Sequence, residues 1–180
     1  MSFCSSLLGC AANATRRYTR NMGKGRYAMN QLLEQALKYA RFGWHIFPCH
    51  CIRGGKCSCG KRDCERQGKH PKTKNGLLDA TTDEAQIREW WRRWPDANIA
   101  ARTGPESRIW VWDCDLPNGP ETTEAAGLPE TLMQRTGSGG TQYFFTYNGT
   151  EIRNSTRHVG PGVDIRGVNG YVILPPSNHI

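Results

Sequence analysis

Two aspartates, Asp113 and Asp115, stand two residues apart at the end of an apolar run that starts at Ile109. If that run is a β-strand, its side chains alternate between faces, so both carboxylates point the same way and Cys114 points the other way. Two carboxylates on one face, at the end of a buried strand, form a hard-oxygen site suited to Mg²⁺ or Mn²⁺. The alternative is a strand that simply ends in a polar turn, because residues 115–119 read Asp-Leu-Pro-Asn-Gly.

A third aspartate, Asp164, lies in the short apolar run 162–166. Buried acids bind a metal or pair with a base, and the nearest base in the sequence is Arg166, on the same face of the predicted strand. Two acids close in sequence and a distant third can hold two metal ions, which activate an attacking hydroxyl and neutralise a transferring phosphoryl group. The three acids therefore favour nucleotidyl-transfer chemistry, with an Asp164–Arg166 ion pair as the alternative.

A Gly/Ser turn, Thr136-Gly-Ser-Gly-Gly140, precedes the β-favouring run 141–147. Its backbone N–H groups and the Ser138 hydroxyl can cradle phosphate oxygens. The turn does not match the P-loop pattern, since no Gly-Lys-Ser/Thr follows it. An ordinary hairpin turn is the alternative.

A cluster of thiols and imidazoles occupies residues 49–70. Five of the eight cysteines lie there, in a stretch rich in Lys, Arg and Gly, and the clustering favours a metal site in a reduced cytosol over a disulfide framework. Three thiolates and one imidazole make a closed structural Zn²⁺ site, which would order a loop too polar to fold by burial. The predicted ligands are Cys57, Cys59, Cys64 and His70. Cys49, His50 and Cys51 are competing ligands just upstream.

The chain of 180 residues fits one domain with a real core, and its net charge of +8 favours a polyanionic partner, nucleic acid first. A generally basic soluble protein is the alternative. No apolar run approaches the ~18 residues that a membrane span needs, and the run before Cys10 is too short for a signal peptide. We therefore expect a cytoplasmic protein that does not bind membranes.

Local patterns predict the elements that position these residues. Helices are expected over 30–42, capped by Asn30, and over about 83–94, capped by Thr82 or Asp83 and ended by Pro95. The tryptophans of the second helix share its apolar face, so they are predicted to be core and not a base-stacking platform. The predicted strands cover 44–48, 98–102, 109–113, 141–147, 162–166 and 171–174. Helices fall first and strands dominate later, which predicts an α/β (α+β) fold with helices packed on a mixed or antiparallel sheet.

The two ends of the chain carry separate expectations. Residues 1–28 hold five basic residues and no acid, which predicts a disordered basic tail that helps to hold nucleic acid. An extended or misassigned start before Met29 is the alternative. At the other end, the chain stops directly after the last predicted strand, at Ile180, so we expect a domain cut from a longer protein.

Short blocks in a fixed order give the chain a resemblance to one family between Met29 and Ser177. They are Gly43-Trp-His-Ile-Phe-Pro48, the Cys-x-Cys segment, Gly68-Lys-His-Pro71, Asp79-Ala-Thr-Thr82, Trp94-Pro-Asp-Ala-Asn-Ile99, Thr103-Gly104, Asp113-x-Asp115, Arg135-Thr-Gly-Ser-Gly-Gly140, Gly160-Pro-Gly-Val-Asp-Ile-Arg166, Gly170-Tyr171 and Pro175-Pro-Ser177. The chain resembles the N-terminal domain of bifunctional primase-polymerases (Prim-Pol), in the archaeo-eukaryotic primase superfamily. Such domains occur in phage, plasmid and integrated-element replication proteins.

The resemblance implies an archaeo-eukaryotic primase fold with an RRM-like core, and it implies that Asp113, Asp115 and Asp164 hold Mg²⁺ or Mn²⁺. It implies that the turn with Ser138, Gly139 and Gly140 contacts the triphosphate of the incoming nucleotide. Lys69 and Arg166 are phosphate contacts by position. The usual family pattern has a His two residues after the Gly-Gly pair, where this chain has Gln142. A Gln can donate a hydrogen bond to phosphate but carries no charge, which predicts weaker nucleotide affinity.

The hypothesis that follows is a metal-dependent DNA primase/polymerase formed by residues 29–180, which adds dNTPs or NTPs on a DNA template or primer. The alternative is a zinc-stabilised nucleic-acid-binding module that has lost catalysis and recruits a helicase; Gln142 and the abrupt end of the chain favour it. A metal-dependent nuclease would use similar acids but would leave the nucleotide-binding pieces unexplained.

Overall fold

The computed structural model describes residues 24–178. The predicted basic tail therefore lies outside the described residues as far as position 23. From there the elements are α1 (Lys24–Arg41), β1 (Ile46–Cys49), β2 (Ile52–Arg53), β3 (Lys56–Cys57), η1 (Gly76–Asp79), α2 (Glu84–Arg93), β4 (Asn98–Arg102), β5 (Ile109–Cys114), α3 (Gly119–Ala126), β6 (Leu132–Arg135), β7 (Thr141–Thr146), β8 (Ser155–Thr156), β9 (Val163–Arg166) and β10 (Tyr171–Leu174).

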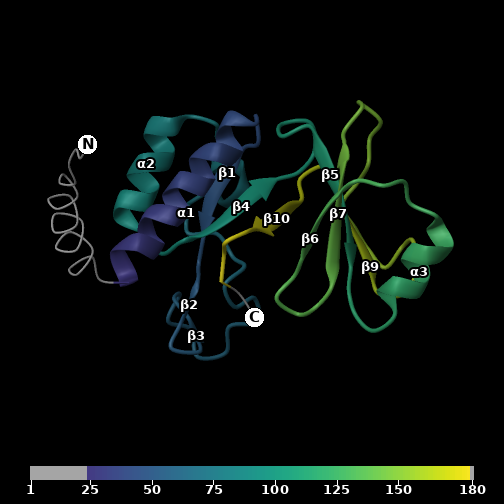
Figure 1. Ribbon diagram of the computed structural model, residues 1–180, viewed down its shortest axis with the longest axis horizontal. Helices are drawn as coiled ribbons and strands as arrows, with labels where there is room; N and C mark the ends of the chain where they lie inside the picture. The colour runs from purple at the N-terminus through teal and green to yellow at the C-terminus, as the bar shows by residue number, and fades with distance from the viewer. Residues whose placement is uncertain (1–23, 179–180) are drawn as a thin grey trace, which may run out of the picture.

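A three-stranded antiparallel sheet, in the order β1-β4-β10, lies in one half of the molecule (Figure 1). One face of this sheet presents Ile46, Ile99 and Leu174 to the main hydrophobic core, to which α1 and α2 contribute. The other face presents Phe47 and its neighbours to a smaller cluster with residues of η1. The sheet is therefore buried on both faces, which is why its strands read as short continuous apolar runs.

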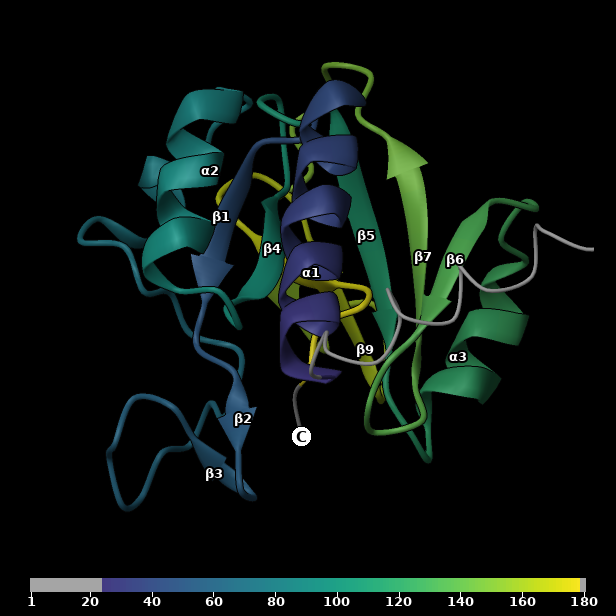
Figure 2. The ribbon, with the colours of Figure 1, turned by 60° about the vertical axis from the view of Figure 1, so that its left-hand side comes forward.

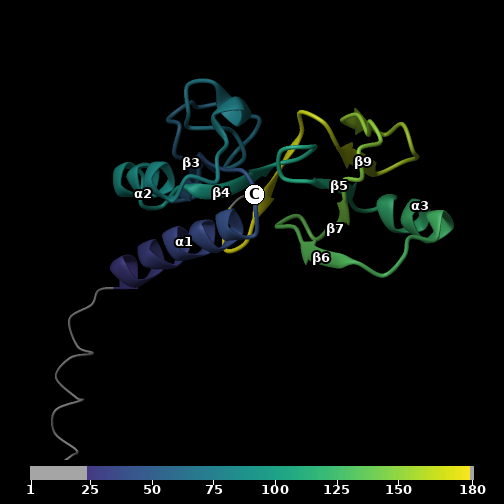
Figure 3. The ribbon, with the colours of Figure 1, turned by 90° about the horizontal axis from the view of Figure 1, so that it is seen from above.

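A five-stranded antiparallel sheet, in the order β6-β7-β5-β9-β8, lies in the other half of the molecule. Val111 and Phe144 on one face of this sheet complete the main core with α1. The other face packs Trp112 and its neighbours under α3, and the Trp112 indole donates a hydrogen bond to the Thr123 hydroxyl at 2.9 Å. Figure 3 shows α3 on the far side of this sheet from the three-stranded sheet.

The hairpin β2-β3 and the loop that follows it project away from both sheets (Figure 2). The loop returns to β1 as an extended segment, since His50 N–H donates to His70 O at 2.8 Å and Lys72 N–H donates to Pro48 O at 2.9 Å. The hairpin carries Cys57, and the loop that follows it carries the other three predicted zinc ligands.

The predicted α/β class with antiparallel sheets and packed helices is confirmed, although the strands form two larger sheets and not one. Helix α2 follows its sequence signals: the Asp83 side chain accepts a hydrogen bond from Ala85 N–H at 2.9 Å, and the helix stops before Pro95. The predicted Asn30 cap is wrong, because α1 already begins at Lys24. Among the tryptophans of α2, Trp91 is core, with 2% of its surface exposed, whereas Trp90 and Trp94 are only partly buried.

None of the helices in the described part of the chain is long and apolar enough to cross a lipid bilayer.

Candidate active site

The residues predicted for acid and phosphate chemistry converge on a cavity of about 590 Å³ between the two larger sheets. Six of them line it, namely Lys69, Asp113, Asp115, Ser138, Gln142 and Arg166, whereas Asp164, Gly139 and Gly140 are not among the lining residues. The three-stranded sheet contributes Tyr171, Val172 and Ile173 of β10 to the same wall. The site is therefore a junction between halves of the molecule that are distant in sequence.

The three predicted acids meet at the ends of β5 and β9. Asp113 and Asp164 are directly opposite each other in the antiparallel pairing of these strands, so their side chains share one face. Asp115 follows the last residue of β5, and its backbone is fixed on both sides: its N–H donates to Gly162 O at 2.7 Å, and its carbonyl accepts from Gly119 N–H at 2.8 Å. The strand pairing and this turn thus place the three acids in one region, although within residues 24–178 their oxygens do not form a close ligand cluster as the Cys/His residues do.

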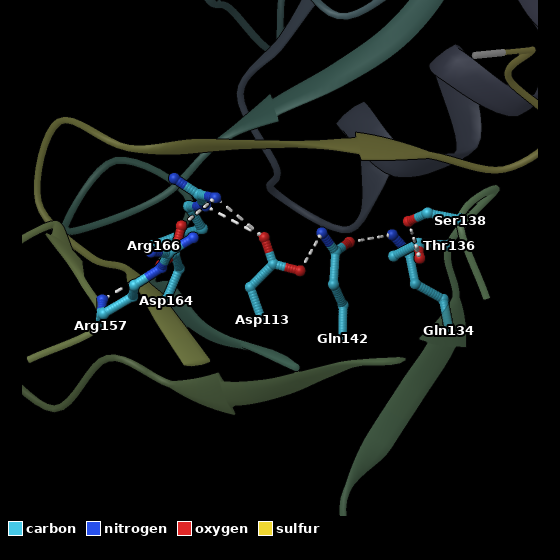
Figure 4. A network of polar contacts seen from close by, with 8 residues as sticks. All are labelled: Asp113, Gln134, Thr136, Ser138, Gln142, Arg157, Asp164 and Arg166. Carbon is cyan, nitrogen blue, oxygen red and sulfur yellow. Dashed lines mark hydrogen bonds and ion pairs between the residues drawn. The ribbon is translucent and has the colours of Figure 1, made fainter. Parts of the chain in front are cut away.

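Arg166 bridges two of these acids. Its Nη2 atom lies 3.0 Å from Asp113 Oδ2 and 2.9 Å from Asp164 Oδ2, and its Nε atom lies 3.2 Å from Asp113 Oδ2 (Figure 4). The other oxygen of Asp164 accepts from Arg157 N–H at 3.2 Å. The predicted ion pair between Asp164 and Arg166 is therefore present, and Asp113 shares it.

Gln142 occupies the other side of Asp113. Its side-chain amide donates to Asp113 Oδ1 at 2.9 Å, and its carbonyl accepts from Gln134 Nε2 at 2.5 Å. Gln134 also donates to Ile173 O at 2.8 Å, which ties β6 to β10. Figure 4 shows the row that results, from Arg157 through Asp113 to Gln134. The nitrogen and the oxygen of the Gln142 side-chain amide thus both have protein partners. Each carboxylate oxygen of Asp113 also has a partner, Gln142 on one side and Arg166 on the other.

Negative charge accumulates at Asp115. Burial is the largest cause that raises the pKa of this carboxyl, and the charges of Asp113 and Asp164 add to it. Arg166 and Lys69 lower the pKa but do not cancel these effects. A site in which carboxylates raise one another's pKa gains free energy when a cation binds between them.

The Gly/Ser turn and a basic segment form the rest of the wall. Thr136 N–H donates to Gly140 O at 3.0 Å and Gly139 N–H donates to Thr136 O at 3.1 Å, which closes the turn and leaves the Ser138 hydroxyl at the cavity. Gly140 packs so closely on Cys114 O that a Cβ there would clash. Lys69 lines the same cavity from the loop after β3. A hydroxyl and an ammonium group therefore face the acids across a space open to a ligand.

A family model for the N-terminal domain of bifunctional DNA primase/polymerases (Prim-Pol) matches residues 36–180. The chain belongs to this Prim-Pol family. Membership implies activity of the DNA primase/polymerase type, with DNA and nucleotides as substrates. No individual curated protein is similar enough to the chain to count as a match.

The Prim-Pol chain also carries a second candidate site, in the hairpin and loop beyond β1. One ligand atom from each of four residues lies within 4.8 Å of the others, and these residues are Cys57, Cys59, Cys64 and His70. The His70 Nε2 atom is 3.3 Å from Cys57 Sγ and 3.5 Å from Cys64 Sγ. Three sulfurs and one imidazole are the donor set of a structural zinc site. The four predicted ligands are thus brought together and could hold a metal such as zinc.

The competing thiols lie elsewhere in this Prim-Pol domain. Cys49 is fully buried in β1, and Cys51 donates its thiol hydrogen to Asp96 at 3.3 Å. His50 stacks on His70 with ring centroids 4.4 Å apart, and burial is the main cause that lowers the pKa of His50 to about 4. His50 is therefore neutral at neutral pH and supports the ring of His70.

Hydrogen bonds of the loop backbone connect the two candidate sites. Tyr171 donates its hydroxyl hydrogen to Lys69 O at 2.8 Å, and Asn98 donates its amide to Gly68 O at 2.8 Å. His70, a zinc-site residue, is the next residue after Lys69. The loop that closes around a metal is thus the loop that brings Lys69 to the acids.

Sequence reasoning missed several residues of the acid cavity. The lining includes Arg66, Thr136, Asn154, Thr156 and Asn169. Arg66 belongs to the Lys/Arg-rich loop, and only its positive charge could have indicated that it contributes to the site. Gln134, which fixes Gln142, lies in β6, where the exposed residues show no alternation of apolar and polar side chains.

Proposed function

We propose that this Prim-Pol chain is a metal-dependent nucleotidyltransferase that starts or extends strands on a DNA template, using dNTPs or NTPs, in a phage or plasmid replication system. The observation that carries the proposal is a cavity lined by Asp113 and Asp115 together with Lys69 and Arg166. Asp164 stands opposite Asp113 in the strand pairing and contacts Arg166, although it does not line the cavity itself. Acids for metals and bases for phosphates in one cavity are the requirements of nucleotidyl transfer.

The residues present fit a hard divalent cation. All the donors are carboxylate oxygens, the ligands that Mg²⁺ and Mn²⁺ prefer. Burial is the largest cause of the raised pKa of Asp115, and the charges of Asp113 and Asp164 add to it. The Arg166 guanidinium, itself a cation, lies between Asp113 and Asp164. We propose that all three aspartates are the metal ligands.

The side chains around the cavity then have two roles, binding the triphosphate and orienting Asp113. The ammonium group of Lys69 and the Ser138 hydroxyl bind oxygens of the triphosphate, and Arg166 is within reach of the same space. Gln142 orients Asp113 through its amide. Bound metal ions supply activation of the attacking hydroxyl and neutralise charge on the phosphoryl group.

A template-extension assay tests the proposal. The zinc-loaded protein is incubated with primed and unprimed DNA template, labelled dNTPs or NTPs, and Mn²⁺ or Mg²⁺. We expect template-dependent product, and we expect Asp113→Ala or Asp115→Ala to reduce it at least ~100-fold, since loss of a ligand costs more than loss of an outer partner. Absence of product from the folded, zinc-loaded wild-type protein would contradict the proposal.

The second candidate function is a zinc-stabilised nucleic-acid-binding module without catalysis, attached to a helicase. One observation favours it: Gln142 is uncharged, and both ends of its amide are occupied by Asp113 and Gln134. Under this alternative the protein binds DNA, contains zinc and makes no product with any nucleotide or metal. The same assay, run beside a DNA-binding measurement, separates the two functions.

A further inference from the structure

A second cavity, of about 670 Å³, lies between α2 and the segment that follows the zinc loop. Basic residues Lys72, Lys74 and Arg93 line it together with the partly buried rings of Trp90 and Trp94. The cavity shares no lining residue with the acid cavity. Its combination of cations and aromatic rings is the one that proteins use to hold single-stranded nucleic acid.

The cations of this groove form no close ion pair in the described part of the chain, although Lys74 interacts at longer range with Asp79 and Arg93 with Glu89. Within residues 24–178, none of the ion pairs involves Lys72, Lys74 or Arg93. On the same helix, by contrast, Arg88 pairs with Glu84 and Arg92 pairs with Glu89. The groove side of α2 therefore carries cations that are not held in close ion pairs.

The two acids in the groove are already engaged with the protein. Asp79 accepts from Asn75 N–H at 2.9 Å and from the Asn75 amide at 2.8 Å, and Asp83 caps α2. These hydrogen bonds leave both carboxylates charged, so three cations against two acids give the groove lining a formal net charge of +1. A positive lining suits a phosphate backbone.

The rings add a second, independent feature. Lys72 Nζ lies 5.6 Å from the centroid of the Trp94 ring, and Arg93 Cζ lies 4.8 Å from it. Both cations are therefore held at an aromatic surface. Because both cations lie over the Trp94 ring, a base would stack on Trp90 or on Trp94 after one cation moves aside to contact its phosphate.

The groove is adjacent to the acid cavity along one short segment. Lys69 faces the acid cavity and Lys72 faces the groove. Three residues of extended chain span at most about 11 Å, so only a short segment separates the two cavities. The segment is held against β1 by the hydrogen bond from Lys72 N–H to Pro48 O at 2.9 Å.

We propose that this groove, formed by Lys72, Lys74, Arg93, Trp90 and Trp94, binds a single strand of DNA and leads it to the acid cavity. The identity of that strand as the template rests on the proposed function. Binding of a single strand to the groove does not rest on it.

Fluorescence anisotropy of a labelled oligo(dT) strand with the full chain tests the proposal. We expect Lys72→Ala, Lys74→Ala and Arg93→Ala each to weaken binding several-fold, and each to lower the slope of log K against log salt by about 0.7, the value for one phosphate contact to a single strand. Arg92→Ala is the matched control, because Arg92 is the neighbouring residue on α2 and is paired with Glu89. The control should bind as the wild type does.

The ring is tested by Trp94→Phe and Trp94→Leu, with thermal melting to verify folding. We expect Phe to retain most of the affinity and Leu to lose roughly 5-fold or more. Equal affinity of the three basic-residue variants and the wild type would overturn the proposal, as would complete displacement of oligo(dT) by dTTP at equal phosphate concentration. If Trp94→Leu unfolds, the three basic-residue variants and Trp94→Phe decide.

The failures of the two proposals are distinguishable. If Asp113→Asn loses product but the groove variants bind DNA normally, the groove proposal is wrong and the enzyme proposal stands. If the groove variants lose DNA affinity and the wild type makes no product, the groove stands and the enzyme proposal is wrong.

Discussion

The Arg166 guanidinium lies 3.0 Å from the Asp113 carboxylate, across the pairing of β9 with β5. The same nitrogen lies 2.9 Å from Asp164, so one cation serves two acids. Only 8% of the Asp113 side chain is exposed, and burial at this level makes the contact strong and makes loss of either partner costly. A metal ion that binds Asp113 and Asp164 must therefore compete with Arg166.

Substitution Arg166→Gln should reveal this competition. In the presence of a chelator of divalent ions, we expect the free energy of unfolding to fall by up to about 3 kcal/mol, because Asp113 and Asp164 lose their shared cation. Mn²⁺ should then raise the melting temperature of the variant more than that of the wild type, since binding to the native state alone stabilises it. Thermal melts over a Mn²⁺ series measure both effects.

Arg153→Gln is the control for that experiment. Arg153 also pairs with an acid two residues away, Glu151, but its side chain is 81% exposed, so the substitution should change little. An Arg166→Gln protein that gains no more from Mn²⁺ than the wild type would contradict competition between Arg166 and the metal.

Substitution Gln134→Leu should change the hydrogen bonding of Asp113 indirectly, because Gln134 contacts Gln142 and Gln142 contacts Asp113. Gln134 holds the Gln142 carbonyl, and this contact fixes which end of the Gln142 amide faces Asp113. We expect a loss of about 1–3 kcal/mol in the free energy of unfolding, because the buried carbonyl of Gln142 loses its donor. We also expect weaker Mn²⁺ binding, measured by calorimetry.

Met133→Ala is the matched control for Gln134→Leu. Met133 is the neighbouring residue of β6 and is 62% exposed, so neither stability nor Mn²⁺ affinity should change much. Unchanged Mn²⁺ affinity in Gln134→Leu would show that Gln142 keeps its orientation without this partner.

The elements that sequence alone could predict are those with local causes. Helix α2 has its cap at Asp83 and its stop at Pro95, and β4 is an apolar run between turns. The four zinc-site residues could be predicted from the sequence, because their residue types and their spacing both indicate a zinc site. By contrast, β6 has largely exposed residues and no apolar alternation, so nothing local distinguishes it from a loop.

The network around Asp113 could not be predicted in the same way. That Gln142 faces Asp113 depends on the register between β5 and β7, which pairs these two residues across 29 positions of sequence. Register is set by the packing of the whole sheet and by the connecting turns. Similarly, the acid cavity needs β10 from the other sheet, and no sequence pattern reports which sheet a strand will join.

Substitution Gly162→Ala should displace Asp115. Gly162 has φ of +71°, and a Cβ there would meet Gly119 N and lie 2.9 Å from Asp115 O. We expect a loss of several kcal/mol in stability, because strain in the left-handed region costs about 1–2 kcal/mol and the clash adds to it. Gly149→Ala is the control: φ is +95°, and nothing lies within 4 Å of its Cβ position. Denaturant unfolding compares the two, and equal losses would exclude a role for the contact beside Asp115.

Removal of the zinc ligands should affect the zinc content first and nucleotide binding second. We expect Cys57→Ser and Cys64→Ser to lose bound zinc, measured by elemental analysis of the purified proteins, because a structural site needs all four donors. Cys51→Ser is the control, since its thiol contacts Asp96 and not the cluster. Unchanged zinc in both ligand variants would refute the assignment.

The consequence for nucleotide binding follows from the position of Lys69, between the hydrogen bond to Tyr171 and the zinc-site residue His70. We expect zinc loss to weaken nucleotide binding at the acid cavity, because the loop that carries Lys69 loses one of its anchors. Tyr171→Phe removes another anchor, one hydrogen bond of about 1 kcal/mol, and should weaken nucleotide binding about 5-fold with zinc retained. Zinc loss in the Tyr171→Phe protein should then cost more than in the wild type, because fewer anchors remain on either side of Lys69. If the two losses simply add, the loop does not couple the zinc site to Lys69.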